Sequence, residues 1–535
     1  MPSSESSSRR PALTRRSLLT GAAALGGGLA VPGLALPATA APARRAASLV
    51  SSGTPELTHG IQSGDVRATS ATVWARSDRP ARMLVQVSTT PDFREVRTVR
   101  GAAVTDGSDF TGKTVLDGLP PGGDVYYRVV PVDPWDDAHA GAPVAGHLRT
   151  SPVQAGDVTF LWSGDLGGQG WGIDRSRGGY RIFSAMRGLD PDFYICNGDN
   201  IYADDPIEAD VPLPDGSVWH NVVTEEKSKV AETLDEFRGN YKYNLLDDNI
   251  RAFYADVAQI QQWDDHETHN NWYPGEILDD PLYSEKRVDV LKFRSRQAWH
   301  EYTPIAPAYD DENRIYRVIH HGPLLDVIVL DMRWYRDANS TDRQTFNDGG
   351  ILGTTQAEWL KRELLASSAT WKVISNDMPL GMVVTDTTQG QPNLEAVSQG
   401  DPGVPLGREI QIADILSFLK QHDIRNVVWL TTDVHYTAAQ YFDPDQAAFK
   451  DFNPFWQFVS GPLNAGGFPP DAVDATFGCQ QVFVKAPTVS NASPATEFQF
   501  FGEVHIDGAS REFTVRLRDN SGAVLWSTDL SPSRR

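Results

Sequence analysis

Two patterns of hydrophobic and polar positions divide the chain. Between residues 57 and 150, short runs in which apolar and polar residues alternate, such as 70–75, 83–87 and 125–130, are separated by Gly, Pro and Asp. Runs of this length with no helical period between them predict a small β-sandwich. From residue 156 onward, apolar runs alternate with segments of helical period, which predicts a layered α/β domain over residues 156–530.

The same pattern places the individual elements of the α/β region. Strands are predicted at 158–162, 193–196, 257–263, 325–330, 371–375 and 427–430. Helices are predicted at 179–187, 230–244, 285–302, 355–367 and 409–421. A closing hairpin is expected to pair 513–517 with 523–526. The segments 204–219 and 385–407 have no regular pattern, and we expect these long loops to border a functional site.

The first 43 residues have the composition of an export signal. Arg15 and Arg16 precede a weakly apolar Ala/Gly/Leu run that ends near Leu36, and small residues follow it. A twin arginine before such a stretch predicts twin-arginine export across a bacterial membrane, and therefore a secreted protein. A membrane anchor is the weaker alternative, because five glycines and Pro32 interrupt the segment. Elsewhere no run reaches the roughly 20 apolar residues that span a bilayer.

Composition and charge narrow the classes of protein. The chain has 535 residues, of which 40% are hydrophobic, so it can bury a large core and is neither disordered nor fibrous. Its net charge of −22 repels nucleic acid, and it repels anionic membranes unless divalent cations bridge the two surfaces. Cys196 and Cys479 are the only cysteines, so a metal site would rest on oxygen and nitrogen ligands. No protein partner is indicated.

Clusters of polar residues follow four of the predicted strands. They occupy residues 163–168, 197–204, 264–267 and 431–435. One Asp-rich loop would indicate only a turn, because Asp forms local hydrogen bonds there. Four such loops at the carboxyl ends of neighbouring strands would crowd several carboxylates together, which is unfavourable without a cation. The sequence therefore predicts a metal site at this edge of the sheet.

The residue types at this site indicate its chemistry. Carboxylates with one or two imidazoles suit iron, manganese, zinc or calcium. A carboxylate that bridges two cations about 3.5–4 Å apart allows the pair to clamp a phosphoryl group and to lower the pKa of water. We therefore expect hydrolysis of a phosphoester.

A family resemblance agrees with this chemistry. Asp165 in Gly-Asp-Leu-Gly and Asp199 in Gly-Asp-x-x-Tyr-x-Asp look like the first two motifs of the calcineurin-like metallophosphoesterases, in the purple acid phosphatase variety. Four further blocks resemble the alkaline phosphatase D (PhoD-like) family: residues 263–272, 330–336, 353–360 and 371–373. The resemblance runs from about residue 57 to the final hairpin. It implies a calcineurin-like layered β-sheet/helix domain preceded by a fibronectin-III/Ig-like β-sandwich.

The finer form of two motifs narrows the resemblance within this family. Asn-Gly-Asp-Asn-Ile-Tyr-Ala-Asp at 197–204 and Thr-Thr-Asp-Val-His-Tyr at 431–436 look most like the secreted, calcium-dependent bacterial phospholipase D of PhoD-like type. By this resemblance, Asp199 bridges two metals. Tyr202, His435 and Asp165 hold the first metal, for which the resemblance implies ferric iron.

The remaining candidate residues also take their roles from the resemblance. Asp265 and Asp433 face the second cation, for which calcium is expected, with manganese or zinc as alternatives in the centre. His266 stands beside the leaving group and is expected to stabilise the transition state or to donate a proton. Asn271 and Arg333 are candidates for binding phosphate oxygens, and either could instead be structural.

Three functions remain open at this stage. The first is a secreted metal-dependent phosphodiesterase, with phospholipase D activity as its sharpest form. No His in the sequence has Lys two positions later, so the His-x-Lys-x4-Asp phospholipase signature is absent and water is the expected nucleophile. The second is an alkaline phosphatase or broad phosphodiesterase that scavenges phosphate. The third is a calcium-dependent binding protein without turnover.

Overall fold

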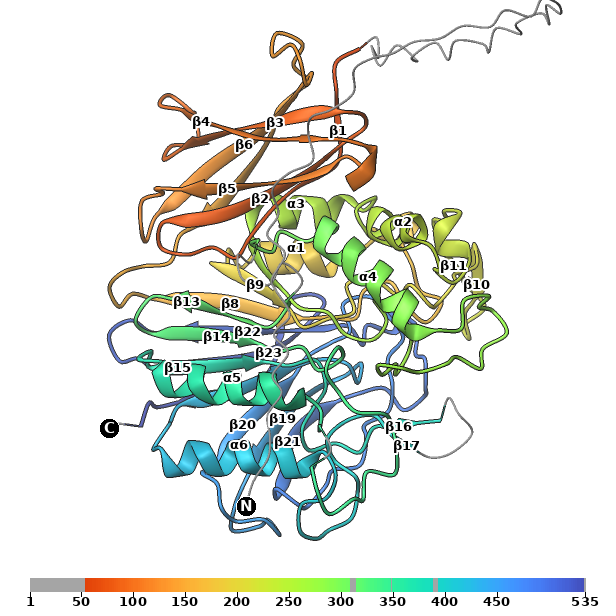
Figure 1. Ribbon diagram of the computed structural model, residues 1–535, viewed down its shortest axis with the longest axis vertical. Coiled ribbons are helices and arrows are strands. Elements are labelled where there is room, and N and C mark those ends of the chain that lie inside the picture. The colour runs from red at the N-terminus through yellow and green to blue at the C-terminus, as the bar shows by residue number, and fades with distance from the viewer. Residues whose placement is uncertain (1–52, 308–313, 348, 388–392, 534–535) are drawn as a thin grey trace, which may run out of the picture. The chain divides into compact units, whose positions relative to one another are not determined.

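The computed structural model of the chain describes residues 53–307, 314–347, 349–387 and 393–533 (Figure 1). The predicted export signal at residues 1–43 lies outside these residues. Among the helices of the described part, none is both long enough and apolar enough to cross a membrane.

The described residues form 24 strands and six α-helices. The strands are β1 (Leu57–Gly64), β2 (Ser70–Ser77), β3 (Ala81–Ser88), β4 (Arg97–Val104), β5 (Thr111–Asp117), β6 (Asp124–Val132), β7 (Val144–Arg149), β8 (Val158–Ser163), β9 (Phe193–Cys196), β10 (Asp210–Pro212), β11 (Val218–His220), β12 (Ala258–Gln261), β13 (Arg317–His321), β14 (Leu325–Val329), β15 (Trp371–Ser375), β16 (Thr385–Asp386), β17 (Asn393–Leu394), β18 (Val427–Thr431), β19 (Thr437–Phe442), β20 (Phe455–Val459), β21 (Cys479–Lys485), β22 (Phe500–Ile506), β23 (Phe513–Asp519) and β24 (Val524–Leu530). The α-helices are α1 (Ile182–Arg187), α2 (Leu234–Asn244), α3 (Asp248–Asp256), α4 (Val288–Tyr302), α5 (Gly353–Ala366) and α6 (Glu409–Gln421).

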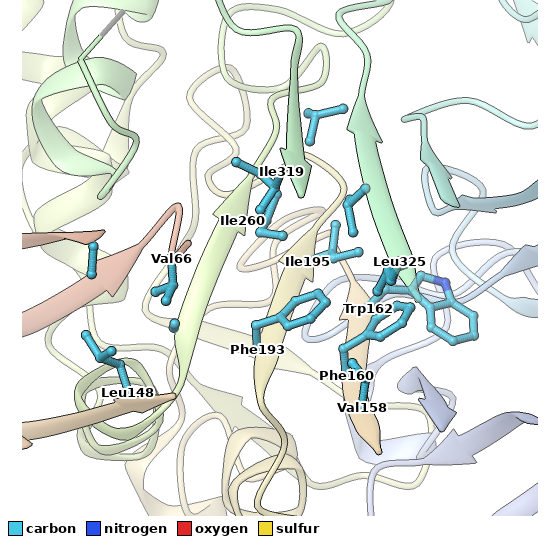
Figure 2. Packing of buried hydrophobic residues seen from close by; sticks show 14 of the residues in the cluster. Val66, Leu148, Val158, Phe160, Trp162, Phe193, Ile195, Ile260, Ile319 and Leu325 are labelled. Carbon is cyan, nitrogen blue, oxygen red and sulfur yellow. The ribbon is translucent and has the colours of Figure 1, made fainter. Parts of the chain in front are cut away.

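Two sheets pack against each other at the centre of the α/β region (Figure 2). The first contains β8, β9 and β12 as parallel neighbours, and the second contains β14, β15 and β18 as parallel neighbours. Along β8, Phe160 and Trp162 belong to the core between the sheets, whereas Leu161 belongs to the core on the other face. Because both faces of these strands are buried, they are almost continuously apolar in the sequence.

Helices cover the outer face of each sheet. Tyr194 of β9 packs in one cluster with Phe253 of α3 and other residues of α1–α4. Trp429 of β18 packs in another cluster with Leu360 of α5 and Ile415 of α6. The region therefore has four layers, with helices outside and two sheets inside.

Strands β1–β7 form the N-terminal sandwich. One sheet has the order β4-β3-β6-β7, and the other contains β1, β2 and β5. Strand β1 also pairs in parallel with β12, where Gly64 lies opposite Gln259. A Cβ at Gly64 would lie 2.6 Å from the Gln259 carbonyl oxygen, so this close approach requires glycine. The sandwich sheet thereby continues into the nine-stranded sheet β24-β23-β22-β8-β9-β12-β1-β2-β5.

Each strand and helix that the hydrophobic pattern predicted is present, but α1, α2 and α4 begin three or four residues later than predicted. Helix α1 starts at Ile182 because Gly178 and Gly179 have φ values of +91° and +64°, which a right-handed helix cannot contain. Helix α2 starts at Leu234 because Thr233 forms a capping box with Glu236. The pattern did not predict α3, which has only nine residues.

Candidate metal centre

The candidate site residues lie at one edge of the two central sheets, because they follow the carboxyl ends of parallel strands. Asp165, Asp199 and Asp265 follow β8, β9 and β12 of the first sheet. On the second sheet, Arg333 follows β14 and Asp433 follows β18. Segments that are far apart in the sequence therefore meet in one buried site.

The backbone at this edge is strained where the ligands turn inward. The φ angle is +64° at Asp165, +49° at Asp199, +73° at Asp433 and +58° at His435. Residues other than glycine rarely adopt this left-handed conformation, and such strain collects at functional sites. The surrounding fold holds four candidate ligands in this conformation.

Asp165, Asp199 and His435 form the first group of candidate ligands. One ligand atom from each lies within 4.8 Å of the others, and all three side chains are buried. Both carboxylate oxygens of Asp165 are buried without a hydrogen-bond partner among the described residues. The Tyr202 Oη atom lies 2.7 Å from His435 Nε2. Unpaired buried carboxylate oxygens beside a phenol and an imidazole match the donor set of a hard metal ion.

The orientation of His435 leaves one ring nitrogen available for a metal. Its Nδ1 lies 2.5 Å from the Gly466 carbonyl oxygen, which can only accept, so Nδ1 carries the proton. Burial lowers the pKa of His435 to about 4, and the ring is therefore neutral at physiological pH. Its Nε2 lone pair faces Tyr202 and Asp165, and Asp165 Oδ1 lies 3.9 Å away.

Two further groups extend the site away from His435. One contains Asp199, Asp265 and His266, and the other contains Asp264, Asp265 and Asp433. Within each group the possible ligand atoms lie within 4.8 Å of one another. Asp199 belongs to two groups, which is the position that a bridging ligand requires.

Burial and mutual repulsion act on these carboxylates together. Burial, followed by the charges of neighbouring carboxylates, raises the pKa values of Asp165, Asp199 and Asp433 well above their usual range. Without bound cations, these three carboxyl groups therefore lose their protons only at a higher pH than an ordinary Asp. Divalent or trivalent cations would favour their ionised form, so the residues present fit a metal centre.

His266 is held by a carboxylate outside the predicted ligand set. Its Nδ1 lies 2.8 Å from Asp204 Oδ1, and its ring stacks on Tyr202 with 4.2 Å between the ring centroids. Burial alone would lower the pKa of His266, but the charges of Asp204 and Asp265 outweigh it and raise this pKa to about 10. The imidazole is therefore cationic at neutral pH and keeps a proton on Nε2 that it can donate.

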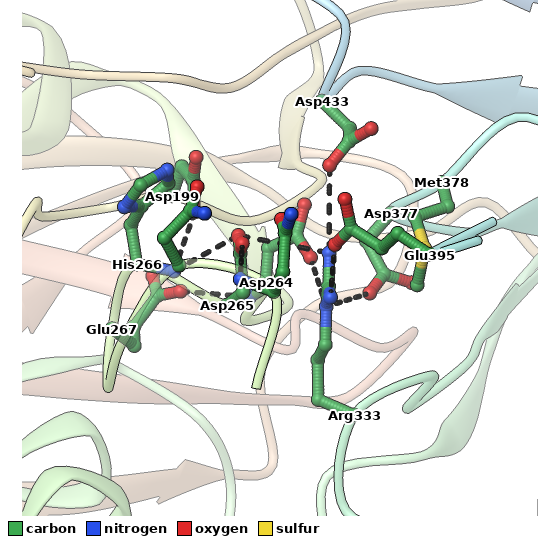
Figure 3. Close-up of polar contacts among 12 residues, drawn as sticks. Asp199, Asp264, Asp265, His266, Glu267, Arg333, Asp377, Met378, Glu395 and Asp433 are labelled. Carbon is green, nitrogen blue, oxygen red and sulfur yellow. Dashed lines mark hydrogen bonds and ion pairs between the residues drawn. The ribbon is translucent and has the colours of Figure 1, made fainter. Parts of the chain in front are cut away.

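Arg333 lies at the centre of the carboxylates on the other side of the site (Figure 3). Its side chain is fully buried, with 0% of its surface exposed. The guanidinium contacts Asp264 Oδ1 at 2.6 Å and Asp433 Oδ1 at 3.4 Å. It also pairs with Glu395 and lies 3.6 Å from Asp265 Oδ1. Arg333 thus supplies fixed positive charge inside an acidic cluster.

Comparison with known families agrees with this geometry. Residues 160–517 match the model of the PhoD-like phosphatase family, and residues 42–152 match the model of its N-terminal domain. The chain belongs to the PhoD-like phosphatase family. The chain is 26% identical over 434 residues to alkaline phosphatase D of Bacillus subtilis (strain 168), which covers 77% of this chain and 70% of that protein.

Solved structures show the same architecture as this PhoD-like phosphatase. A structure of PhoD superposes with a TM-score of 0.65 at 20% sequence identity, over 90% of each chain. A purple acid phosphatase from yellow lupin (Lupinus luteus) seeds superposes with a TM-score of 0.55 at 11% identity, over 90% of this chain and 74% of that one. The fold is therefore the metallophosphoesterase fold that the motifs indicated, preceded by a β-sandwich.

The structure brings most of the predicted site residues of the PhoD-like phosphatase together. Asp165, Asp199, Asp265, His266, Asp433 and His435 belong to the candidate ligand groups, and Tyr202 contacts His435. The backbone N–H of Asn271 donates to Asp265 Oδ2 at 2.6 Å, so Asn271 borders the second group. Cys196 faces the helical layer instead, and its buried thiol lies 3.6 Å from the Gly198 carbonyl oxygen.

Several functional candidates were not predicted as site residues. Asp204 and Asp264 lie inside the polar clusters, but the sequence does not show which Asp in a cluster faces the site. Asp377 follows β15 and could have been found by the rule that identified the other strand ends. Glu395 lies in the unpatterned 385–407 segment, and no local signal marks it.

Proposed function

We propose that this PhoD-like phosphatase is a metal-dependent phosphodiesterase that acts as a phospholipase D and releases the head group from phospholipids such as phosphatidylcholine. The observation that carries the proposal is the buried centre shared by Asp165, Asp199 and Asp265, next to the cationic His266. The carboxylates would hold cations that bind the charged phosphoryl oxygens. His266 would donate a proton to the leaving alcohol.

The ligand sets suggest where two kinds of cation would bind. Asp165, Tyr202 and His435, together with Asp199, would hold ferric iron, because a phenolate and carboxylates are hard ligands. Asp265 and Asp433 would hold calcium, and manganese or zinc are the alternatives at either position. Bound cations supply Lewis acidity toward the phosphoryl oxygens and lower the pKa of water. Elemental analysis of the purified protein identifies the ions.

His266 would act as the general acid. Its Nδ1 proton is held by Asp204, so the ring is fixed in place and Nε2–H points away from that carboxylate. Choline and other alcohol head groups leave as poor alkoxides unless they receive a proton. We assign proton donation to His266 and positioning of His266 to Asp204.

The charge of the site favours a phosphodiester over a phosphomonoester. A monoester dianion needs more positive charge than a diester monoanion. Arg333 is fully buried and directs its guanidinium at Asp264, Glu395 and other carboxylates, so it neutralises the protein rather than a second substrate charge. Scavenging of phosphate from monoesters is the second candidate function, and it is supported by the match to the PhoD-like phosphatase family and to alkaline phosphatase D of Bacillus subtilis.

Water is the proposed nucleophile, and the enzyme is proposed to be secreted. Since the sequence has no His-x-Lys pair, no phosphohistidine is expected, and water attacks phosphorus directly. This route gives hydrolysis with little transfer of the phosphatidyl group to added alcohols. The twin-arginine segment at residues 1–43 supports secretion, and calcium could bridge the acidic protein to a lipid surface.

The decisive experiment compares two substrates on one metal-replete sample. Choline release from phosphatidylcholine vesicles and phosphate release from 4-nitrophenyl phosphate are measured with and without added calcium, and the chelated protein gives the background. We expect calcium-dependent choline release to dominate. Dominant monoester turnover would establish phosphate scavenging instead, and binding of calcium without turnover of either substrate would indicate a binding protein.

A further inference from the structure

One cavity, of about 320 Å³, is not part of the candidate metal centre. It is lined by the segments that precede α1 and β22 and by residues of other loops, and its lining includes Arg177, Arg181, Trp219, Asn464 and Gln499. None of the candidate metal ligands is among its lining residues. Its volume falls at the lower end of the roughly 300–1,000 Å³ of ligand sites, so it suits a small ligand.

Gln499 is the unusual residue of this cavity. Only 3% of its surface is exposed, and neither its amide oxygen nor its amide nitrogen has a hydrogen-bond partner among the described residues. Burying an amide without partners is costly, and native structures rarely leave both ends of one unsatisfied. A ligand in the cavity that accepts hydrogen bonds would satisfy the amide nitrogen.

The charged residues that line the cavity are two arginines and Glu497, so positive charge exceeds negative charge there by one. Arg177 and Arg181 both line it, although the protein as a whole carries a net charge of −22. Arg181 is 55% exposed and lies 3.7 Å from Glu497, which is too loose a pair to occupy its donors. The guanidinium of Arg177 lies 5.6 Å from the centre of the Trp219 ring. Because that ring is already covered, it is not free to stack on a sugar or a base.

We propose that this cavity is an oxyanion-binding subsite, in which a phosphate group binds to the Gln499 amide and to the guanidiniums of Arg177 and Arg181. Guanidinium groups and an amide N–H are the usual partners of phosphate oxygens. The phosphate is either inorganic phosphate or part of a phosphodiester.

The subsite is joined to the metal centre through Asn464. Its backbone N–H donates to the Asp165 carbonyl oxygen at 3.2 Å, and its carbonyl oxygen accepts from Gly167 at 2.7 Å. Its side-chain amide donates to the Trp171 carbonyl oxygen at 3.0 Å. A ligand in the cavity therefore contacts the residue that supports the loop of Asp165, and its binding can influence the metal centre.

Calorimetric titration of the metal-loaded protein with inorganic phosphate tests the subsite. We expect two classes of binding site, one at the metal centre and one in the cavity. Gln499→Leu and Arg181→Ala should each weaken the cavity class at least tenfold and leave the other class unchanged. Gln499→Leu is expected to fold, because leucine replaces an unsatisfied amide with an apolar group. Arg175→Ala removes an exposed arginine that does not line the cavity, and it should bind as the unchanged protein does.

A parallel titration with glycerophosphocholine separates the two sources of phosphate. Binding of inorganic phosphate identifies free phosphate as the ligand, and binding of the diester alone identifies a second contact for the substrate. The proposal fails if neither probe binds outside the metal centre. It also fails if Gln499→Leu and Arg181→Ala both keep two classes of binding site with unchanged affinities. Because the readout is binding and not turnover, its failure is distinct from failure of the proposed phosphodiesterase activity.

Discussion

Gly168 lies directly against the ring of Tyr202. A Cβ at position 168 would lie 2.4 Å from the Tyr202 Cγ and Cδ1 atoms, which is far inside van der Waals contact. Gly168→Ala should therefore displace the phenol from His435 and reduce activity at least tenfold, together with affinity for the first metal. Metal titration and initial rates measure both effects.

Gly156→Ala provides the matched control for this substitution. Nothing lies within 4 Å of a Cβ at Gly156, so alanine should be tolerated there with unchanged rates. If Gly168→Ala binds metal and turns over substrate as well as Gly156→Ala does, the packing of Tyr202 does not matter for the centre.

Asp204→Asn tests the assigned proton donor. Removing the carboxylate should lower the pKa of His266 from about 10, since Asp204 is the largest contribution that raises it. A general acid must be protonated, so activity is lost as pH rises through this pKa, and the loss should begin at lower pH in the variant. The pH profile of kcat/KM measures the shift. Asp210→Asn is the control, because it removes an exposed carboxylate that pairs with His220. It should leave the pH profile of kcat/KM unchanged.

Arg333→Met removes the positive charge at the centre of the acidic cluster. We expect a loss of about 3–5 kcal/mol in the free energy of unfolding, because buried carboxylates lose their counter-ion. Added calcium should restore more stability to the variant than to the unchanged protein, and urea denaturation with and without calcium measures this difference. Arg187→Met, which breaks an exposed pair with Asp256, should cost no more than about 1 kcal/mol. Equal free energies of unfolding for Arg333→Met and Arg187→Met would contradict the role of Arg333 as counter-ion of the buried carboxylates.

Glu409, which belongs to none of the candidate ligand groups, makes stability depend on pH. Burial, with a smaller contribution from Asp474, raises its pKa to about 8 in the folded protein, against 4.5 for an ordinary Glu. The folded state thus holds this proton more tightly than the unfolded state, and stability falls as pH rises from 4.5 through 8. Glu409→Gln should have little effect at pH 4.5 and stabilise the protein at pH 8.5, by a few kcal/mol. Thermal unfolding at both pH values measures this stabilisation. An equal change in Tm at pH 4.5 and pH 8.5 would be inconsistent with the raised pKa of Glu409.

Much of the fold follows from the sequence because its central strands are buried on both faces. Val158–Ser163 and Trp371–Ser375 are nearly continuous apolar runs that end in polar residues, so both the strands and the edge that carries the site are visible. Strands β19–β22 were not predicted, because strands such as β21 alternate partly exposed residues and resemble loops.

Within the site, the sequence predicts the residues that closely follow a strand, but not those that come from irregular loops. Asp165, Asp199 and Asp433 stand directly after apolar runs, whereas Glu395 reaches Arg333 from a loop whose path depends on tertiary contacts. Backbone carbonyls of Leu394 and Glu395 accept hydrogen bonds from the buried Arg408. Contacts of this kind over long sequence separations leave no local pattern.

The most direct test of the metal centre is Asp199→Asn, with bound metal, fold and phosphodiesterase activity measured on the same preparation. Asp199 belongs to two ligand groups, so the account predicts a lower metal content, a loss of activity of at least about a hundredfold and an unchanged circular dichroism spectrum. Full activity with the original metal content would contradict the central claim that Asp199 joins two metals at a catalytic centre.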